Sequence, residues 1–287
     1  MTKVTMDLVK ELREKTQVGM MDCKKALEET QGDIDKAIEL LRKKGAAVAA
    51  KRADNETNHG RIEAYLSSDF KQGSLVEISC ETDFSANTDA MKAFALLTAQ
   101  AATQSQVTQA DALLAHNKAL HNMHNELLAK ISEKIFINRV SCFRVETHGL
   151  INVYIHPGST VGTMIELSTQ QDPSRDIETL KALARELCMQ IAVTKPLWIN
   201  TTDVSAETIA QEKTIAHEQL KSSTKSAQII NKIVEGKVSK YFEDTCLTKQ
   251  RFIKNEDLTV EQHLKSISDT LKNGITIKRF TRFAVGK

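Results

Sequence analysis

Two stretches of the chain show the same order of predicted elements, strand–strand–helix–strand. The first comprises strands at residues 61–66, 75–78 and 135–143, with helical segments between the last two. The second comprises strands at residues 150–155, 161–167 and 275–283, with a helix whose apolar residues run from Leu180 to Ala192. Because a sheet and a helix each bury an apolar face, they must pack against one another. The pattern predicts an α+β fold with two subdomains on small antiparallel sheets, duplicated in architecture but not in sequence identity.

Residues 1–53 predict a three-helix domain that precedes both subdomains. Apolar residues recur at helical spacing after a cap at Thr5, and Gly32 ends a second helix at a left-handed position. Asp33 then caps a third helix that runs to Gly45. This arrangement resembles three-helix domains of the ubiquitin-associated type. Residues 46–58 read as a helical or frayed linker, so we expect domains at 1–53, 54–144 and 145–287.

The second subdomain is interrupted by a helical insertion at about residues 205–243. One helix begins at Ser205, the pattern breaks at residues 222–224, and a second helix follows to Phe242. The sparse apolar positions are Ile209, Ile215, Leu220, Ile229, Ile230, Ile233, Val234 and Val238. They predict an antiparallel, coiled-coil-like helical hairpin with one apolar seam. Such a hairpin buries little surface and should be mobile unless a partner holds it.

A strand-to-helix corner at residues 80–87 carries an apolar ring, Phe84, beside a carboxylate, Asp83. Such connections lie at the protein surface, so a large apolar ring at this position requires an explanation. Phe84 either folds back onto Met91 or Phe94 of the following helix, or it fills a pocket on another protein. Both interpretations are open at this point.

The composition limits the classes of protein to which this chain can belong. A net charge of +2 disfavours a protein whose main partner is nucleic acid, for which steep salt dependence would be expected. No apolar stretch approaches a membrane span, and the first residues lack a signal-peptide core. The cysteines are odd in number, scattered and never in a CxxC pair, which argues against a disulfide framework or a thiolate zinc site. We therefore expect a cytoplasmic protein.

The sequence contains no recognisable catalytic motif. Phosphate-binding loops of the GxxxxGK[ST] and GxGxxG types and the GxSxG elbow are missing. His116, His121 and His124 are interpreted as a solvated helix face rather than metal ligands, and His156 as a turn or contact residue. The chain is predicted to act by binding, not as an enzyme, and without cofactor or metal.

Two surface features of the N-terminal domain have competing interpretations. Met20 and Met21 are either one core and one exposed methionine or an adaptable contact surface. The basic residues Arg42, Lys43, Lys44, Lys51 and Arg52 are interpreted as a solvated helix end rather than a phosphate site.

Two long motifs occur in order, residues 9–27 and residues 77–87. They resemble the signatures of the bacterial translation elongation factor Ts family. With the three-helix start, the two subdomains, the hairpin and the final Arg279–Phe283 strand, the resemblance covers essentially the whole chain. Departures occur at Gln17-Val18, where the family commonly has Gly-Ala, at Ser79 for Asn and at Ser85 for Val.

The resemblance implies a guanine-nucleotide exchange factor for elongation factor Tu. It implies that Thr82, Asp83 and Phe84 contact the partner's G domain, where the ring displaces magnesium and releases GDP. It further implies that Arg13, Met20, Met21 and Lys24 contact the same partner domain, that Ile131 adds an apolar contact, and that His156 and the more variable Ile253-Lys254 lie at other contacts. A dimer is allowed. The alternative is a non-enzymatic adaptor whose N-terminal domain binds helical or ubiquitin-like partners.

Overall fold

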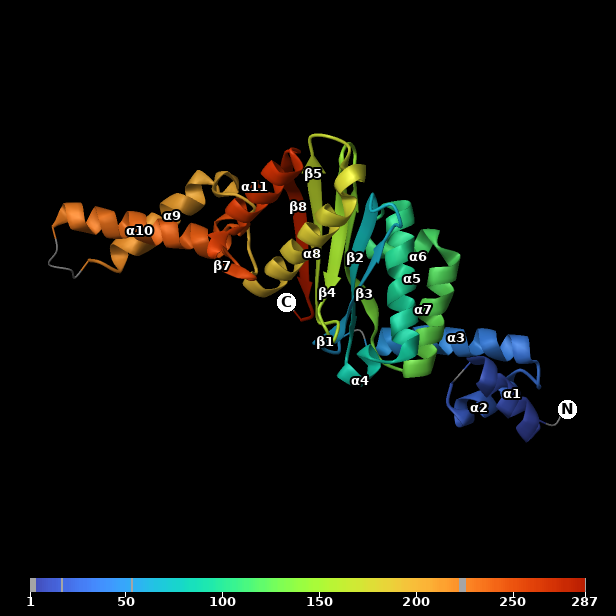
Figure 1. The fold of residues 1–287 in the computed structure, drawn as a ribbon. Helices are drawn as coiled ribbons and strands as arrows, with labels where there is room; N and C mark the ends of the chain where they lie inside the picture. The colour runs from blue at the N-terminus through green and yellow to red at the C-terminus, as the bar shows by residue number, and fades with distance from the viewer. Residues whose placement is uncertain (1–3, 17, 53, 222–225, 287) are drawn as a thin grey trace. The chain divides into compact units, whose positions relative to one another are not determined.

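The computed structural model describes residues 4–16, 18–52, 54–221 and 226–286. It forms two compact units. The first comprises residues 1–144, 155–162 and 283–287, and the second comprises residues 145–154 and 163–282. Helices and small sheets are mixed in the described chain, so the predicted α+β class is confirmed (Figure 1).

The N-terminal helices are α1 (Met6–Thr16), α2 (Met20–Glu29) and α3 (Ile34–Lys51). They bury a small core of Val9, Leu12, Val18, Cys23, Ala26, Leu27, Ala37 and Leu41. Gly32 has a φ of 86°, as expected of a residue that ends a helix in the left-handed region. The Thr16–Gly19 motif contains Gln17, which lies outside the described residues.

The predicted end of the third helix at Gly45 is wrong, because α3 continues to Lys51. Gly45 serves packing instead. A Cβ atom there would lie 2.7 Å from the backbone nitrogen of Ala129 in α7 (Lys118–Ile131), so the two helices can approach only over a glycine. Residues 46–51 are therefore part of a helix rather than a frayed linker.

The basic residues near this helix end are paired with carboxylates. The ion pairs join Arg42 to Glu126, Lys43 to Glu39, Lys44 to Glu29, and Arg52 to Glu81. The Lys51 side chain lies outside the described part of the structure. These cations are 37–71% exposed, so the described part of the cluster is solvated, as predicted, and its charges are paired with carboxylates.

The first sheet has the order β1–β2–β3, formed by β1 (His59–Leu66), β2 (Gln72–Cys80) and β3 (Phe136–Arg144). Both pairings are antiparallel. The central strand β2 is buried from Gly73 to Cys80, because its even-numbered apolar residues pack under α5 (Asp89–Ser105) and α7. On the other face, Leu75 and Ile62 lie against Gly162. The short helix α6 (Ala110–His116) completes this layer (Figure 1).

The second sheet has the order β4–β5–β8, formed by β4 (Gly149–Ile155), β5 (Val161–Thr169) and β8 (Ile275–Ala284). Its long helix is α8 (Ile177–Thr194), which follows the 3-10 turn η1 (Pro173–Asp176). The remaining elements are η2 (Thr201–Asp203), η3 (Leu247–Lys249), β6 (Arg251–Phe252), β7 (Asn255–Thr259) and α11 (Val260–Leu271).

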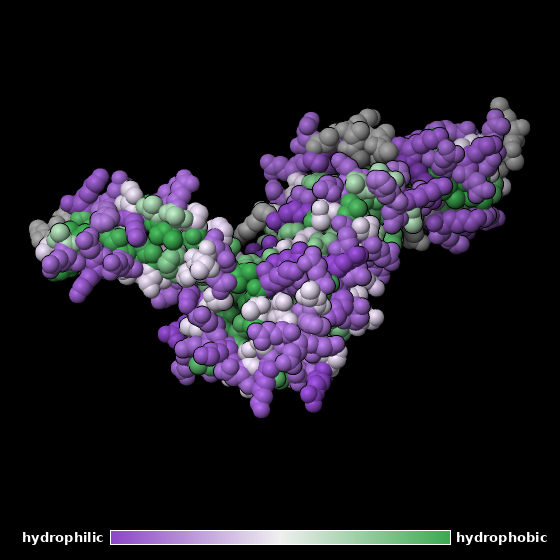
Figure 2. Space-filling view, turned by 90° about the horizontal axis from the view of Figure 1, so that it is seen from above, coloured by the Kyte–Doolittle hydropathy of each residue, from purple (hydrophilic) through white to green (hydrophobic). Residues whose placement is uncertain are grey.

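The predicted helical hairpin is formed by α9 (Ala206–Glu218) and α10 (Ala227–Thr245). Its seam differs in detail from the prediction. Ala216, Val234 and Val238 are buried, whereas Ile215 and Ile229 are 47% and 48% exposed. Figure 2 accordingly shows hydrophobic colour on the hairpin surface at the left. The predicted break at residues 222–224 lies outside the described residues.

The two α+β repeats share individual residues as well as element order, so the expected lack of sequence identity is wrong at these positions. Gly60 and Gly149, Gly73 and Gly162, and Glu77 and Glu166 each stand 89 positions apart. In the last strand of each repeat the separation is 140, and it relates Ile135 to Ile275, Ile137 to Ile277, Arg139 to Arg279, and Phe143 to Phe283.

The shared residues make the same contacts in each repeat. Ser74 donates a hydrogen bond to the helix carbonyl 25 residues later, and Thr163 does the same at the same interval. Glu77 pairs with Arg139, and Glu166 pairs with Arg279. The two repeats therefore pack their strands and helices through the same contacts, and equivalent positions in them can be compared directly.

Candidate functional site

The corner at residues 80–87 is built from two successive helix starts. The Thr82 hydroxyl accepts the Ser85 N–H at 3.3 Å and caps the single-turn helix α4 (Asp83–Ala86). The Asn87 side chain donates to the Asp83 carbonyl at 2.9 Å. Thr88 then caps α5 through the Met91 N–H. These side-chain caps satisfy backbone groups that a one-turn helix cannot satisfy by itself.

Phe84 projects from this corner with 83% of its surface exposed. Met91 and Phe94, its suggested packing partners, are fully buried without it. The staple interpretation is therefore wrong. Ser85 and Ala86 face the interior, because a one-turn helix that begins at Asp83 directs those positions inward and leaves Asp83 and Phe84 outside.

The second repeat shows what such a corner needs for folding alone. The position equivalent to Phe84 is Pro173, which is buried. Asp172 caps that turn by accepting the Ser174 N–H at 2.8 Å. A capped turn and a small inward residue thus suffice for the strand-to-helix connection, and an exposed aromatic ring contributes nothing to it.

Two carboxylates brace the corner from neighbouring segments. Glu133 accepts hydrogen bonds from the Thr82 N–H at 3.2 Å, the Thr82 hydroxyl at 2.8 Å and the Ser85 hydroxyl at 2.7 Å. Glu81 accepts hydrogen bonds from the Lys134 N–H at 2.6 Å and from Arg52 at 2.9 Å. Glu133 was not predicted from the sequence, because its position after a helix carries no local signal of a contact with residues some 50 positions earlier.

The electrostatics of the corner follow from these contacts. Partial burial acts to raise the pKa of Glu81, but hydrogen bonds from Lys134, Asn55 and Arg52 outweigh it and hold that pKa below its ordinary value. Burial, reinforced by the nearby Glu133 carboxylate, raises the pKa of Cys80 to about 12. Cys80 is therefore a buried thiol with no nucleophilic role at neutral pH.

The predicted contact residues of the N-terminal helices belong to the same unit as the corner. Arg13 lies on α1, and Met20, Met21 and Lys24 lie on α2, all with exposed side chains. Met20 is 39% and Met21 62% exposed, so the interpretation of one core methionine is wrong. Cys23, Ala26 and Leu27 fill the core from that helix instead.

Ile131 and His156 are also in the first unit. Ile131 ends α7, packs partly against the core, and precedes Ser132 in a left-handed conformation with φ of 57°. His156 is exposed in the turn between β4 and β5. Ile253 and Lys254 belong to the second unit, where Lys254 pairs with Glu186 at 2.9 Å.

Comparison with known proteins identifies the family. The elongation factor TS family model matches residues 81–287. Elongation factor Ts of Clostridium perfringens (strain SM101 / Type A) is 40% identical over 99% of this chain and 93% of the relative. Elongation factor Ts of Prosthecochloris aestuarii is 39% identical over all of both chains, and that of Nautilia profundicola is 38% identical over 100% of this chain and 94% of its own.

The chain belongs to the elongation factor Ts family. Its role is therefore that of a translation elongation factor, as the predicted resemblance indicated. The relatives extend the match through the N-terminal helices, which the family model leaves out. None of the helices in the described part of the chain is both long and apolar enough to cross a membrane.

Two neighbouring histidines of α7 lie in different surroundings. His121 is exposed, but His124 stacks on Phe94 at 5.2 Å and its Nε2 hydrogen-bonds the Ile135 carbonyl at 2.9 Å. The expectation of a wholly solvated face is thus wrong for His124, whose pKa burial lowers. Within the described residues, no group of three or more His, Cys, Asp or Glu side chains could hold a metal ion.

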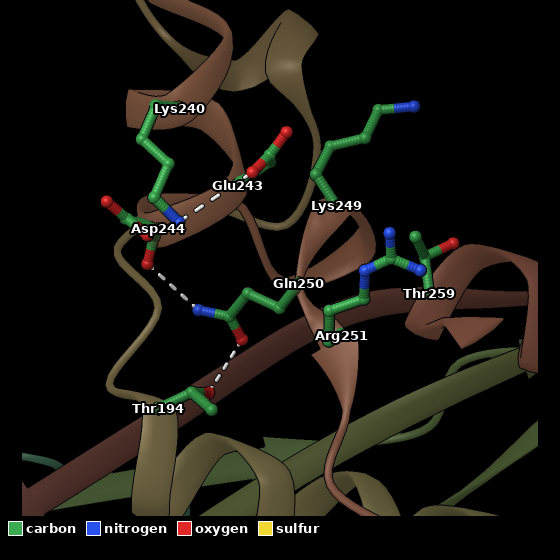
Figure 3. Close-up of a pocket in the computed structure, with 8 residues that line it drawn as sticks. All are labelled: Thr194, Lys240, Glu243, Asp244, Lys249, Gln250, Arg251 and Thr259. Carbon is green, nitrogen blue, oxygen red and sulfur yellow. Dashed lines mark hydrogen bonds and ion pairs between the residues drawn. The ribbon is translucent and has the colours of Figure 1, made fainter. Parts of the chain in front are cut away.

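A cavity of about 500 Å³ lies in the second unit (Figure 3). Lys240 lies 2.8 Å from Asp244 within the cavity, whereas Lys249 pairs with Glu261 outside its lining. The Thr194 hydroxyl donates to Gln250 at 2.6 Å. The eight residues drawn there include no histidine, cysteine or serine. The lining therefore offers no histidine base, and the exposed corner is the better candidate site.

Proposed function

We propose that this protein is a guanine-nucleotide exchange factor for elongation factor Tu, and that Phe84 enters the partner's G domain near its magnesium and phosphate site. The observation that carries the proposal is the 83% exposed ring on a rigidly capped corner. Burial of one large apolar side chain in a partner's pocket contributes about 1.5–3 kcal/mol. Asp83, exposed beside the ring, is a companion polar contact and Thr82 the capping residue next to it.

The free energy needed to release the nucleotide requires contacts with the partner beyond Phe84. A nanomolar nucleotide complex holds about 12 kcal/mol, and weakening it ten-thousandfold needs roughly 5.5 kcal/mol of differential binding. Phe84 cannot provide this alone. We assign the remaining partner-binding energy to Arg13, Met20, Met21 and Lys24 on the N-terminal helices, with Ile131 and His156 as additional contacts. Displacing magnesium, which bridges phosphates, amplifies a small local movement.

The proposed activity makes and breaks no covalent bond, so the protein is not an enzyme in the chemical sense. Linkage makes the effect reciprocal, since GDP must weaken the grip of this protein by the factor by which the protein weakens that of GDP. The proposed setting is the bacterial cytoplasm, during translation elongation.

The deciding experiment is GDP release from elongation factor Tu with the variant Phe84→Ala. We expect the maximal release rate, followed with a fluorescent GDP analogue, to fall about 10- to 100-fold, the equivalent of the 1.5–3 kcal/mol lost. The melting temperature should be unchanged, because 83% of the Phe84 surface is exposed in the free protein.

Leu96→Ala is the matched control, because Leu96 is another exposed apolar residue, on α5. It should leave release unaltered. Unchanged release with Phe84→Ala, or a stability loss of the roughly 3–5 kcal/mol typical of a core Phe, would sink the proposal.

A further inference from the structure

Glu133 reaches the corner from a sharp reversal of the chain. Ser132 ends α7 in the left-handed conformation, with φ of 57°, and β3 begins three residues after Glu133. This reversal places the Glu133 carboxylate under the N-terminal end of α4. There it accepts one backbone N–H and two hydroxyl hydrogen bonds, at 2.7–3.2 Å.

The hydroxyl contacts fix the direction in which the cap acts. The Thr82 oxygen must present a lone pair to the Ser85 N–H. Because Glu133 accepts the Thr82 hydroxyl hydrogen, that lone pair remains free for the cap. Hydrogen bonds to an ionised carboxylate are stronger than neutral ones. A single helical turn has little stability of its own, so its orientation depends on such external bonds.

The second repeat supplies an internal comparison. Asn273 stands 140 positions after Glu133, and Gln171 stands 89 positions after Thr82. Asn273 accepts the Gln171 N–H at 3.0 Å through its Oδ1, so the backbone tie is common to both repeats. Its amide nitrogen donates to the Gln171 carbonyl at 3.4 Å rather than to a hydroxyl of the turn.

In the second corner the Ser174 hydroxyl, 89 positions after that of Ser85, donates to the Asp172 carboxylate within the same turn. The addition in the first corner is therefore a carboxylate from a distant segment that accepts both the Thr82 and the Ser85 hydroxyls. These two bonds occur at the corner that carries the exposed Phe84, whereas the corner stabilised by Asn273 has the buried Pro173, which needs no orientation. Stability of the fold accounts for the backbone tie alone, and the added bonds act on the turn that presents the ring.

We infer that Glu133 is a positioning residue for nucleotide exchange: its carboxylate fixes the orientation of α4 and thereby aims Phe84 at the partner. This inference rests on the proposed exchange function. It assigns no contact with the partner to Glu133, which acts through Phe84. Loss of Glu133 should therefore affect the maximal rate of GDP release more than the affinity for the partner.

The test compares Glu133→Ala, Phe84→Ala and their double variant in GDP release from elongation factor Tu. For Glu133→Ala we expect a maximal rate about tenfold lower and a KM within about twofold of the unsubstituted protein. The double variant should be no slower than Phe84→Ala alone. Glu133 acts only by orienting the Phe84 side chain, and Phe84→Ala already lacks that side chain. Glu133→Gln, which keeps an acceptor but loses the charge, should recover part of the rate.

Asn273→Ala is the matched control, since it removes the equivalent backbone tie in the other repeat and should lower the melting temperature without lowering the maximal rate. If Glu133→Ala does not fold, Ser85→Ala removes one of the two hydroxyl bonds and should give about a threefold loss that Phe84→Ala masks.

The possible failures are distinct. An unchanged rate for Glu133→Ala beside a slow Phe84→Ala, or additive losses in the double variant, overturns the inference and leaves the exchange function standing. A normal rate for Phe84→Ala overturns both.

Discussion

Each repeat contains one buried carboxylate that is paired with one arginine. Substitution of either member of a pair should change the stability of the fold. Glu77 is fully buried, and its Oε2 accepts from Arg139 at 2.5 Å. Arg139 also lies over the Phe283 ring at 4.5 Å and donates to the Ala284 carbonyl. Arg139 therefore pairs with one oxygen of the buried Glu77 carboxylate, whose Oε1 has no hydrogen-bond partner, and also bonds the end of β8.

Arg139→Ala should destabilise the protein by about 3 kcal/mol, because it leaves the Glu77 carboxylate buried without its partner. Urea unfolding at neutral pH measures the loss. The double variant Glu77→Leu/Arg139→Met removes both charges and should recover most of the stability. A double variant as unstable as Arg139→Ala would show that the interaction with Phe283 and Ala284, rather than the uncompensated charge, dominates.

His124 predicts a pH dependence of stability. Burial lowers its folded-state pKa below the ordinary 6.5, so the unfolded chain binds a proton more readily than the folded one. Stability from this residue is present above pH 6.5 and is lost as pH falls from 6.5 through the folded-state pKa. Urea unfolding at pH 7 and pH 5.5 should show that loss, and His124→Phe, which keeps a ring against Phe94, should reduce it. An equal pH dependence in His124→Phe and His121→Gln would contradict this assignment.

The spacing of apolar residues predicted most helices and strands, but it could not decide which residues on the apolar face of a helix are buried. The strands and the helices of both repeats lie where their spacing placed them, because their apolar faces are extensive. In the sparse hairpin, small Ala216 is buried while Ile215 stays exposed, since close approach of two helices favours a small residue. The same limit applies to Met20 and Met21, which tertiary packing leaves outside.

The role of Gly45 was equally hidden, because the same residue ends helices and allows helices to touch. Sequence predicted the corner and its exposed ring as one of two interpretations. It could not predict Glu133, whose contacts with Thr82 and Ser85 depend on the path of a distant segment.

Gly45→Ala tests the contact between α3 and α7. A methyl group 2.7 Å from the Ala129 nitrogen must push the helices apart, and we expect a loss of about 1–3 kcal/mol despite the better helix propensity of alanine. Gly236→Ala in α10 is the matched control, because nothing lies within 4 Å of its added Cβ. That variant should gain up to about 1 kcal/mol. Thermal or urea unfolding of both variants compares the two outcomes, and equal effects would exclude the steric explanation.

At the scale of the whole molecule, the proposed mechanism divides holding the partner from displacing its nucleotide. Binding energy that is equal before and after release changes KM, whereas energy realised only during release changes the maximal rate. The exposed methionines of α2 belong to the holding part, and Phe84 to the displacing part.

The variant Met20→Ala/Met21→Ala should therefore raise KM for elongation factor Tu about tenfold and leave the maximal rate of GDP release within about twofold. Its melting temperature should be unchanged, because both side chains lie outside the core. Steady-state exchange at several partner concentrations separates the two constants. A loss confined to the maximal rate would assign these methionines to displacement instead.

The pairing of Phe84 with Pro173 has a consequence for how such chains evolve. Packing inside the molecule determines the residue at 173, which is buried, but it places almost no demand on position 84. Substitutions at 173 are thus constrained by packing in the fold, whereas in the proposed function substitutions at 84 are constrained by the partner protein. In a duplicated fold, one position can therefore have a packing role in one repeat and, in the proposed function, a binding role in the other.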